Sequence, residues 1–388
     1  MNSKIKNFLL GSAFESFISS ISAIVIGLLF GFIILLISHP SQAIPGFLTI
    51  LLGGFTGGAK GIGDVLYFAT PIILTGLSVG FAFKTGLFNI GASGQFALGA
   101  YFAVSIGIKA TFLPPSIHWI VAIIGGIIGG AIWGAIPGLL KAYRNVHEVI
   151  SSIMMNYIGI YLVNMLVKGD SRIFDTLKNQ SRTPAKGAII PKMGLDNIFG
   201  NSSVNGGIFV AMLAVIVMYI VLNKTTFGFE LKACGHNRDA SRYAGINEKR
   251  SIVLSMLISG ALAGLGGALL LLAGAGKHLE VVDVLPMEGF NGIPIALLGM
   301  SNPIGIFLAA IFIAHINQGG FYLQLYNFVP EIIVIITASI VYFSAFALVF
   351  KRLIANIRKK HGGEEHANAN DDDNDKIPDN NLKEEGTV

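Results

Sequence analysis

Residues 18–37 read ISSISAIVIGLLFGFIILLI, twenty residues without a charged side chain. A helix of about 20 apolar residues matches the hydrocarbon thickness of a bilayer. Lys4 and Lys6 precede this run and Ser41-Gln42-Ala43 follows it, so a cleaved signal peptide has to be considered. The apolar region of a signal peptide is shorter, at about 7–15 residues. We therefore expect an uncleaved first membrane span.

Similar apolar segments fill most of the remaining chain. Only 13% of its 388 residues are charged, against about 25% in soluble domains. The sequence therefore predicts an all-α polytopic membrane protein with about nine or ten transmembrane segments, one or more of them broken. The further segments lie near residues 66–83, 87–108, 119–140, 148–167, 207–222 and 252–275, in a Gly/Pro-broken pair at 290–300 and 303–316, and at 329–350.

Two domains are expected, a transmembrane domain at residues 1–350 and a polar, disordered tail at residues 351–388. With the N-terminus inside, the inner segments hold more lysine and arginine than the outer ones, which favours a multi-pass plasma-membrane protein with both termini cytoplasmic. Cys234 is the single cysteine, which excludes an internal disulfide framework and a cysteine-rich metal site. The basic residues are not interleaved with aromatic ones, so no nucleic-acid partner is expected.

Residues 88–95, FNIGASGQ, place three polar side chains inside an apolar segment. Asn89, Ser93 and Gln95 suit a broken helix that lines a solute path, because an unpaired polar group in hydrocarbon is costly. They equally suit a helix contact in which the amides pair with neighbours. Asn156 and Asn291 are further path candidates, Asn156 with a helix–helix hydrogen bond as its alternative, and Asn291 because glycine and proline follow it.

Glycines spaced four apart predict close helix packing rather than chemistry. They form two series, Gly126, Gly130, Gly134 and Gly138, and Gly260, Gly264 and Ala268. The chain lacks a Walker A motif and any recognisable catalytic or metal-binding constellation, so we expect a non-catalytic protein without a cofactor or metal.

Residues 225–246, TTFGFELKACGHNRDASRYAGI, form a charged inner loop. Within it we expect a short helix that Asn237 caps and Gly245 ends. Such a helix, parallel to the membrane, would receive force from a cytoplasmic motor. An ordinary amphipathic interfacial loop is the alternative.

The loop and the following block 257–268 resemble the permease subunits of ABC transporters for branched-chain amino acids, simple sugars and nucleosides. In that family a Gly-x-Asn-x-x-Ala-Ala-x-x-x-Gly-Ile pattern docks into the ATPase. Blocks 146–157 and 289–299 resemble the nucleoside-type branch, which usually has a glutamate where this chain has Ser93. The docking pattern is matched here by Gly235, Asn237, Ala240, Ser241, Gly245 and Ile246, with Ser241 in place of the second alanine.

The resemblance implies the permease subunit of an ATP-driven importer, most readily for nucleosides, that works by alternating access. It implies several partners: separate ABC ATPase subunits that hydrolyse ATP, a second permease subunit (paralogue or self), an extracytoplasmic substrate-binding protein (often a lipoprotein), a small-molecule solute and the membrane lipid around the permease. Simple sugars and branched-chain amino acids remain alternative solutes. An ion-coupled secondary transporter is a different class, disfavoured for protons because the expected spans hold no ionisable residue at their centres.

Overall fold

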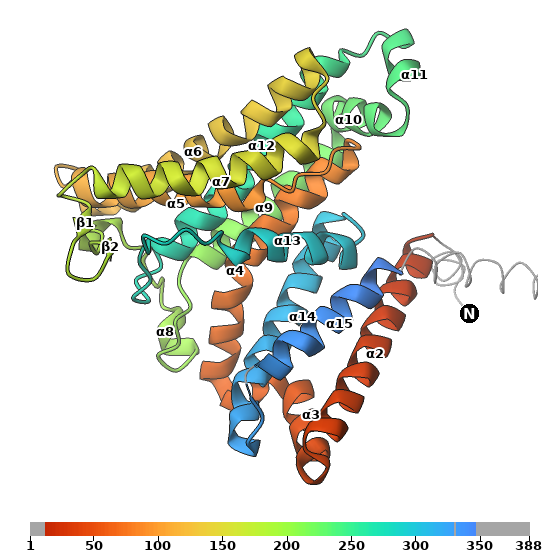
Figure 1. Ribbon diagram of the computed structural model, residues 1–388, viewed down its shortest axis with the longest axis vertical. Coiled ribbons are helices and arrows are strands. Elements are labelled where there is room, and N and C mark those ends of the chain that lie inside the picture. Colours follow the sequence, from red (N-terminus) through yellow and green to blue (C-terminus); the bar gives the residue numbers. More distant parts are fainter. Residues whose placement is uncertain (1–11, 330, 347–388) are drawn as a thin grey trace, which may run out of the picture. The chain divides into compact units, whose positions relative to one another are not determined.

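The computed structural model describes residues 12–329 and 331–346, so the expected tail at residues 351–388 lies outside the described part. The chain divides into two compact units, residues 24–345 and residues 1–23 with 346–388. The first unit is treated below (Figure 1). The α-helices are α2 (Ser12–Ser38), α3 (Ala43–Leu52), α4 (Gly58–Lys84), α5 (Ala92–Lys109), α6 (Pro115–Arg144), α7 (Glu148–Lys168), α8 (Leu195–Ile198), α9 (Gly207–Lys224), α10 (Thr226–His236), α11 (Arg238–Tyr243), α12 (Glu248–Leu271), α13 (Met287–Leu298), α14 (Pro303–Tyr322) and α15 (Glu331–Ala345).

The expected all-α polytopic class is confirmed. In the described part of the chain, seven apolar helical segments are long enough to cross a membrane. They comprise α2, α6, α7, α9, α12, the α14 segment and a long segment from Pro40 to Lys84 that contains breaks. The remaining predicted spans correspond to α5 and to the shorter helices α13 and α15. The only β-strands among the described residues form one short hairpin, β1 (Phe174–Asp175) with β2 (Gln180–Ser181), and Gln180 also makes an isolated bridge to Glu280.

Helix α3 is an element that the sequence reasoning missed. The backbone turns at Gly53, with φ of +49°, and a 3₁₀ segment, η2 (Gly53–Gly57), leads back to α4. This hairpin packs on α14, where Gly319 lies against the backbone of α3. His315 of α14 ties its tip, because its Nδ1 accepts from the Gly54 N–H at 3.3 Å and its Nε2 lies 3.1 Å from the Leu51 carbonyl oxygen.

Helix α12 forms the centre of the bundle, packed against α4, α5 and α6. The predicted glycine contacts are confirmed there. A Cβ atom on Gly134 of α6 would lie 2.8 Å from the Cα of Gly260, and one on Gly130 would lie 2.7 Å from the Cα of Gly264. Small residues therefore let the two backbones approach closely, as in other membrane helix pairs.

Two non-helical segments return into the bundle. Residues 85–91 follow α4, and Asn89 reaches back to Ser78 on α4, so α5 begins at Ala92 rather than at residue 87. Residues 272–286 lead to α13, whose start is tied to α5 because the Ser93 hydroxyl donates to the Pro286 carbonyl oxygen at 2.6 Å. The 12 residues of α13 span about 18 Å, well short of a bilayer core. The predicted break in this region is therefore confirmed, with a tight turn between α13 and α14 (Figure 1).

The loop between α7 and α9 carries an ion pair that ties α5 to the end of α7. Lys109 Nζ lies 2.6 Å from Asp170 Oδ2, and the backbone N–H of Arg172 donates to Asp170 Oδ1 at 3.0 Å. The hydrogen bond from Lys109, followed by that from Arg172, lowers the pKa of Asp170 from 3.8 to about 2.

This lowered pKa predicts a pH-dependent stability difference. A carboxyl whose pKa falls on folding stabilises the fold above its unfolded pKa, and the contribution disappears as the pH falls through the folded pKa. We expect Asp170→Asn to lower the unfolding temperature of the detergent-solubilised protein at pH 7. The gap to wild type should shrink as the pH falls from about 4 towards 2. Asp196→Asn is the control, and a gap that is independent of pH would contradict the assignment.

Candidate functional site: a cavity at a half-length helix and an exposed short helix

A cavity of about 910 Å³ opens between α4, α13, α14 and α15. One wall is α13, whose first turn packs against Ser93 at the start of α5. Half-length helices of this kind expose backbone and side-chain polar groups to a solute at membrane depth. Its lining residues include the polar side chains Lys277, Glu288, Asn291, Asn317, Gln318 and Thr337 and the aromatic rings of Phe68, Phe321 and Tyr342.

Apart from Lys277 on the 272–286 segment, the polar side chains of this cavity come from three helices. Glu288 and Asn291 lie three residues apart on α13, which places them on one helix face. Asn317 of α14 accepts a hydrogen bond at 3.0 Å from the hydroxyl of Thr337 on α15. Gln318 is buried beside Asn317. Asn317 and Gln318 both line the cavity.

Glu288 is a lining residue that the sequence reasoning missed. It lies two residues before the predicted segment 290–300 and so falls outside the expected spans. The structure places it in the first turn of α13, next to Gly289, which packs directly against Ser93. A carboxylate therefore lies one residue from the contact between Gly289 and Ser93.

Asn89 and Gln95 form a closed amide pair in this conformation. Asn89 Nδ2 donates to Gln95 Oε1 at 2.8 Å, and Gln95 Nε2 donates to Asn89 Oδ1 at 3.0 Å. Asn89 also donates to the hydroxyl of Ser259 at 2.7 Å. Both amides are fully buried. The pair fixes the 85–91 segment against α5 and α12.

Asn156 holds the next part of the same segment. Its Oδ1 accepts from the Gly94 N–H at 2.8 Å, and its Nδ2 donates to the Ile90 carbonyl oxygen at 3.0 Å. Of the five predicted path residues, Asn291 lines the cavity, whereas Asn89, Ser93, Gln95 and Asn156 are buried away from it. A path role for these four residues stays a prediction.

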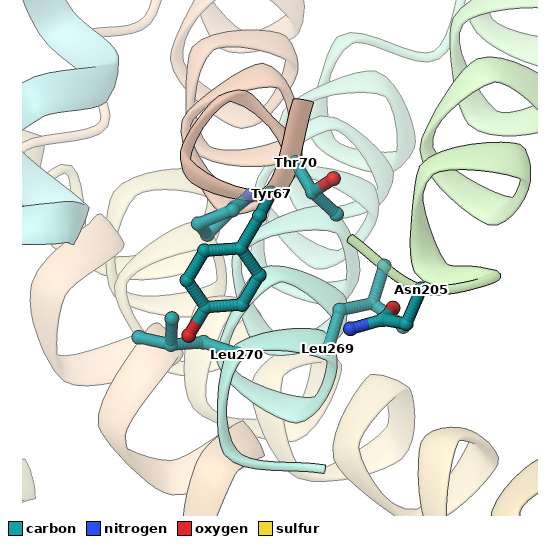
Figure 2. Close-up of a pocket in the computed structure, with 6 residues that line it drawn as sticks. Tyr67, Thr70, Asn205, Leu269 and Leu270 are labelled. Atoms are coloured by element: carbon teal, nitrogen blue, oxygen red, sulfur yellow. The ribbon is translucent and has the colours of Figure 1, made fainter. Parts of the chain in front are cut away.

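A second, smaller hollow lies between α4 and α12, where Tyr67 points towards Leu270 and Asn205 approaches from the start of α9 (Figure 2). Leu269, Thr70 and Pro71 complete its lining, and the space is too narrow for a water molecule. This contact is packing rather than a solute site.

The exposed short helix predicted within residues 225–246 is confirmed as α11. The side chain of Asn237 caps it by accepting from the Ala240 N–H at 3.0 Å, and Ser241 Oγ donates to the Asn237 carbonyl oxygen at 2.7 Å. Gly245 follows the helix with φ of +82°. Ala240 is exposed and Tyr243 is 94% exposed, so α11 offers an open face.

Two neighbours of α11 connect it to the bundle. Gly235, near the end of α10, lies against the backbone of Lys84 and Gly86, where α4 ends. Ile246 donates its backbone N–H to the Ser241 carbonyl oxygen at 3.0 Å and leads into α12. A force on α11 would therefore reach α4 and α12, the helices around the re-entrant segments.

A polytopic helix bundle with a half-length helix at a polar cavity defines a membrane transport protein. Residues 61–347 match the family described as the permease component of the branched-chain amino acid transport system. The chain belongs to this family of transport permeases.

Three curated relatives cover most of the chain. It is 39% identical to the guanosine ABC transporter permease protein NupP of Bacillus subtilis, over 87% of this chain and 95% of that protein. It is 34% identical to the nucleoside ABC transporter permease protein NupB of Lactococcus lactis, over 86% of this chain and 91% of that protein. It is 33% identical to the glucose ABC transporter permease protein TsgB13 of Haloferax volcanii, over 75% of this chain and 78% of that protein. No solved structure matches the chain significantly.

Proposed function

We propose that this chain is the permease subunit of an ATP-driven ABC importer for nucleosides. The observation that carries the proposal is the cavity at α13, where amides, a hydroxyl and a carboxylate lie together with three aromatic rings. A nucleoside presents an aromatic base and several hydroxyl and amino groups, and binding sites for such solutes combine apolar surface with a few placed polar groups. The guanosine and nucleoside permeases among its relatives support the same solute class.

The mechanism is alternating access. ATP-driven closure of cytoplasmic ATPase subunits moves α11, and the movement passes through α10 and α12 to the helices around the cavity. The solute does not react, so the permease only has to bind it differently in two states. The remaining partners are a second permease subunit and an extracytoplasmic binding protein, and both termini are cytoplasmic.

ATP-dependent uptake of labelled guanosine tests this proposal. The chain is expressed with its candidate partners, beside a variant in which the ATPase partner lacks its Walker A lysine. We expect unlabelled nucleosides to reduce the uptake of labelled guanosine, and ribose and leucine to leave it unchanged. The ATPase variant should abolish uptake. Uptake that survives the ATPase variant would remove the ABC mechanism, and competition by ribose alone would move the solute to sugars.

A further inference from the structure

Glu288 is a carboxylate left without a cationic partner inside the cavity. It is half-buried in the first turn of α13. Among the ion pairs of the described residues, none includes Glu288, and Lys277, the other charged lining residue, is exposed on the 272–286 segment. An ionised carboxylate offers hydrogen-bond acceptors and no donor. Its natural complement is therefore a group with hydrogen-bond donors, supplied from within the cavity.

Resting on the proposed function, we propose that Glu288 recognises the solute by accepting hydrogen bonds from two adjacent donors on it. A carboxylate has two oxygens side by side and so accepts two parallel bonds, as it does from arginine. Guanosine presents two such donor pairs: the ring N–H with the exocyclic amino group of guanine, and the 2′ and 3′ hydroxyls of ribose. Both pairs can donate two parallel hydrogen bonds to the carboxylate of Glu288.

The surroundings of Glu288 fit this role. Asn291, one turn along the same helix face, supplies donor and acceptor groups for the rest of the solute edge, and Gln318 of α14 also lines the cavity. The rings of Phe68, Phe321 and Tyr342 offer surface for a planar base. A carboxylate also disfavours phosphorylated solutes, so the same residue separates nucleosides from nucleotides.

Glu288→Gln tests the inference with almost no change in shape. The amide keeps one acceptor but replaces the other with a donor, so a pair of solute donors loses one partner. The full complex, with its binding protein unchanged, is reconstituted in proteoliposomes, and ATP-driven uptake is measured for guanosine, inosine and 2′,3′-dideoxyguanosine. Because the binding protein is the same throughout, a change in the ratio of their rates arises in the permease. Glu280→Gln is the matched control, because Glu280 is an exposed glutamate of the 272–286 segment that precedes α13 and does not line the cavity.

We expect Glu288→Gln to lower the transport efficiency for guanosine roughly 10- to 100-fold, the effect of losing a charge-assisted hydrogen bond, with Glu280→Gln near wild type. A smaller loss for inosine, which lacks the amino group, assigns Glu288 to the base edge. Equal losses for guanosine and inosine, with 2′,3′-dideoxyguanosine unchanged, assign it to the ribose diol.

Wild-type efficiency for all three solutes in Glu288→Gln overturns the inference while leaving nucleoside transport in place. Absence of guanosine uptake in the wild-type complex is a different failure, that of the proposed function. ATPase activity of the reconstituted complex, measured in parallel, shows whether each variant assembles.

Discussion

Ala240→Trp is expected to lower ATP-driven uptake by more than about tenfold while leaving the amount of folded permease in the membrane unchanged. Ala240 is exposed on α11, so an indole there meets solvent in the isolated chain. Substitutions at exposed positions usually change the free energy of unfolding by less than about 0.5 kcal/mol. In the proposed complex the same face is covered by the ATPase, where added bulk in a packed contact costs about 1–3 kcal/mol.

Uptake in proteoliposomes and co-purification of the ATPase subunit check this expectation. Ala240→Ser, which adds a single oxygen atom, is the matched control and should transport nearly as wild type. Gly245→Val is a second probe, because a β-branched residue is strained at φ of +82° and would alter the exit from α11. Uptake at the wild-type rate in Ala240→Trp would contradict the proposal that α11 contacts the ATPase.

Hydropathy alone predicted most of the helices, because a lipid-spanning helix must be both long and apolar. It failed at α3, whose residues 43–52 are as apolar as a span but too few to cross. The turn at Gly53 and the contact with Gly319 of α14 decide that this segment folds back. Such a contact joins residues more than 260 positions apart, and no local pattern encodes it.

The polar motif at residues 88–95 correctly marked a break in the helices, but the direction of its side chains depended on tertiary partners. Asn156 and Ser259 come from other helices, and they complete the hydrogen bonds of this segment. Glu288 was missed for a related reason. A charged residue two positions after Pro286 is typical of a surface loop, and its place next to α5 depends on contacts of Ser93 with Pro286, 193 residues away, and with Gly289.

Asn89→Leu is expected to destabilise the fold by about 2–4 kcal/mol, with transport lost as a consequence. The substitution leaves both ends of the Gln95 amide without the partner that it has in the wild type. Each buried polar group left unpaired costs about 1–3 kcal/mol. Thermal unfolding of the detergent-solubilised protein measures the loss. Asn223→Leu, at an exposed asparagine of α9, is the control and should stay within about 0.5 kcal/mol of wild type.

The reciprocal geometry of this pair also predicts the outcome of a double-mutant cycle. Replacing Asn89 and Gln95 together removes both amides, so no unpaired amide of this pair remains. The loss of stability in the double variant should therefore be smaller than the sum of the losses in the two single variants. A path role for the same residues makes a different prediction, namely reduced uptake in variants whose unfolding temperature is unchanged. Measuring uptake and unfolding on the same four proteins therefore separates a pair that holds the re-entrant segment in place from one that contacts the solute.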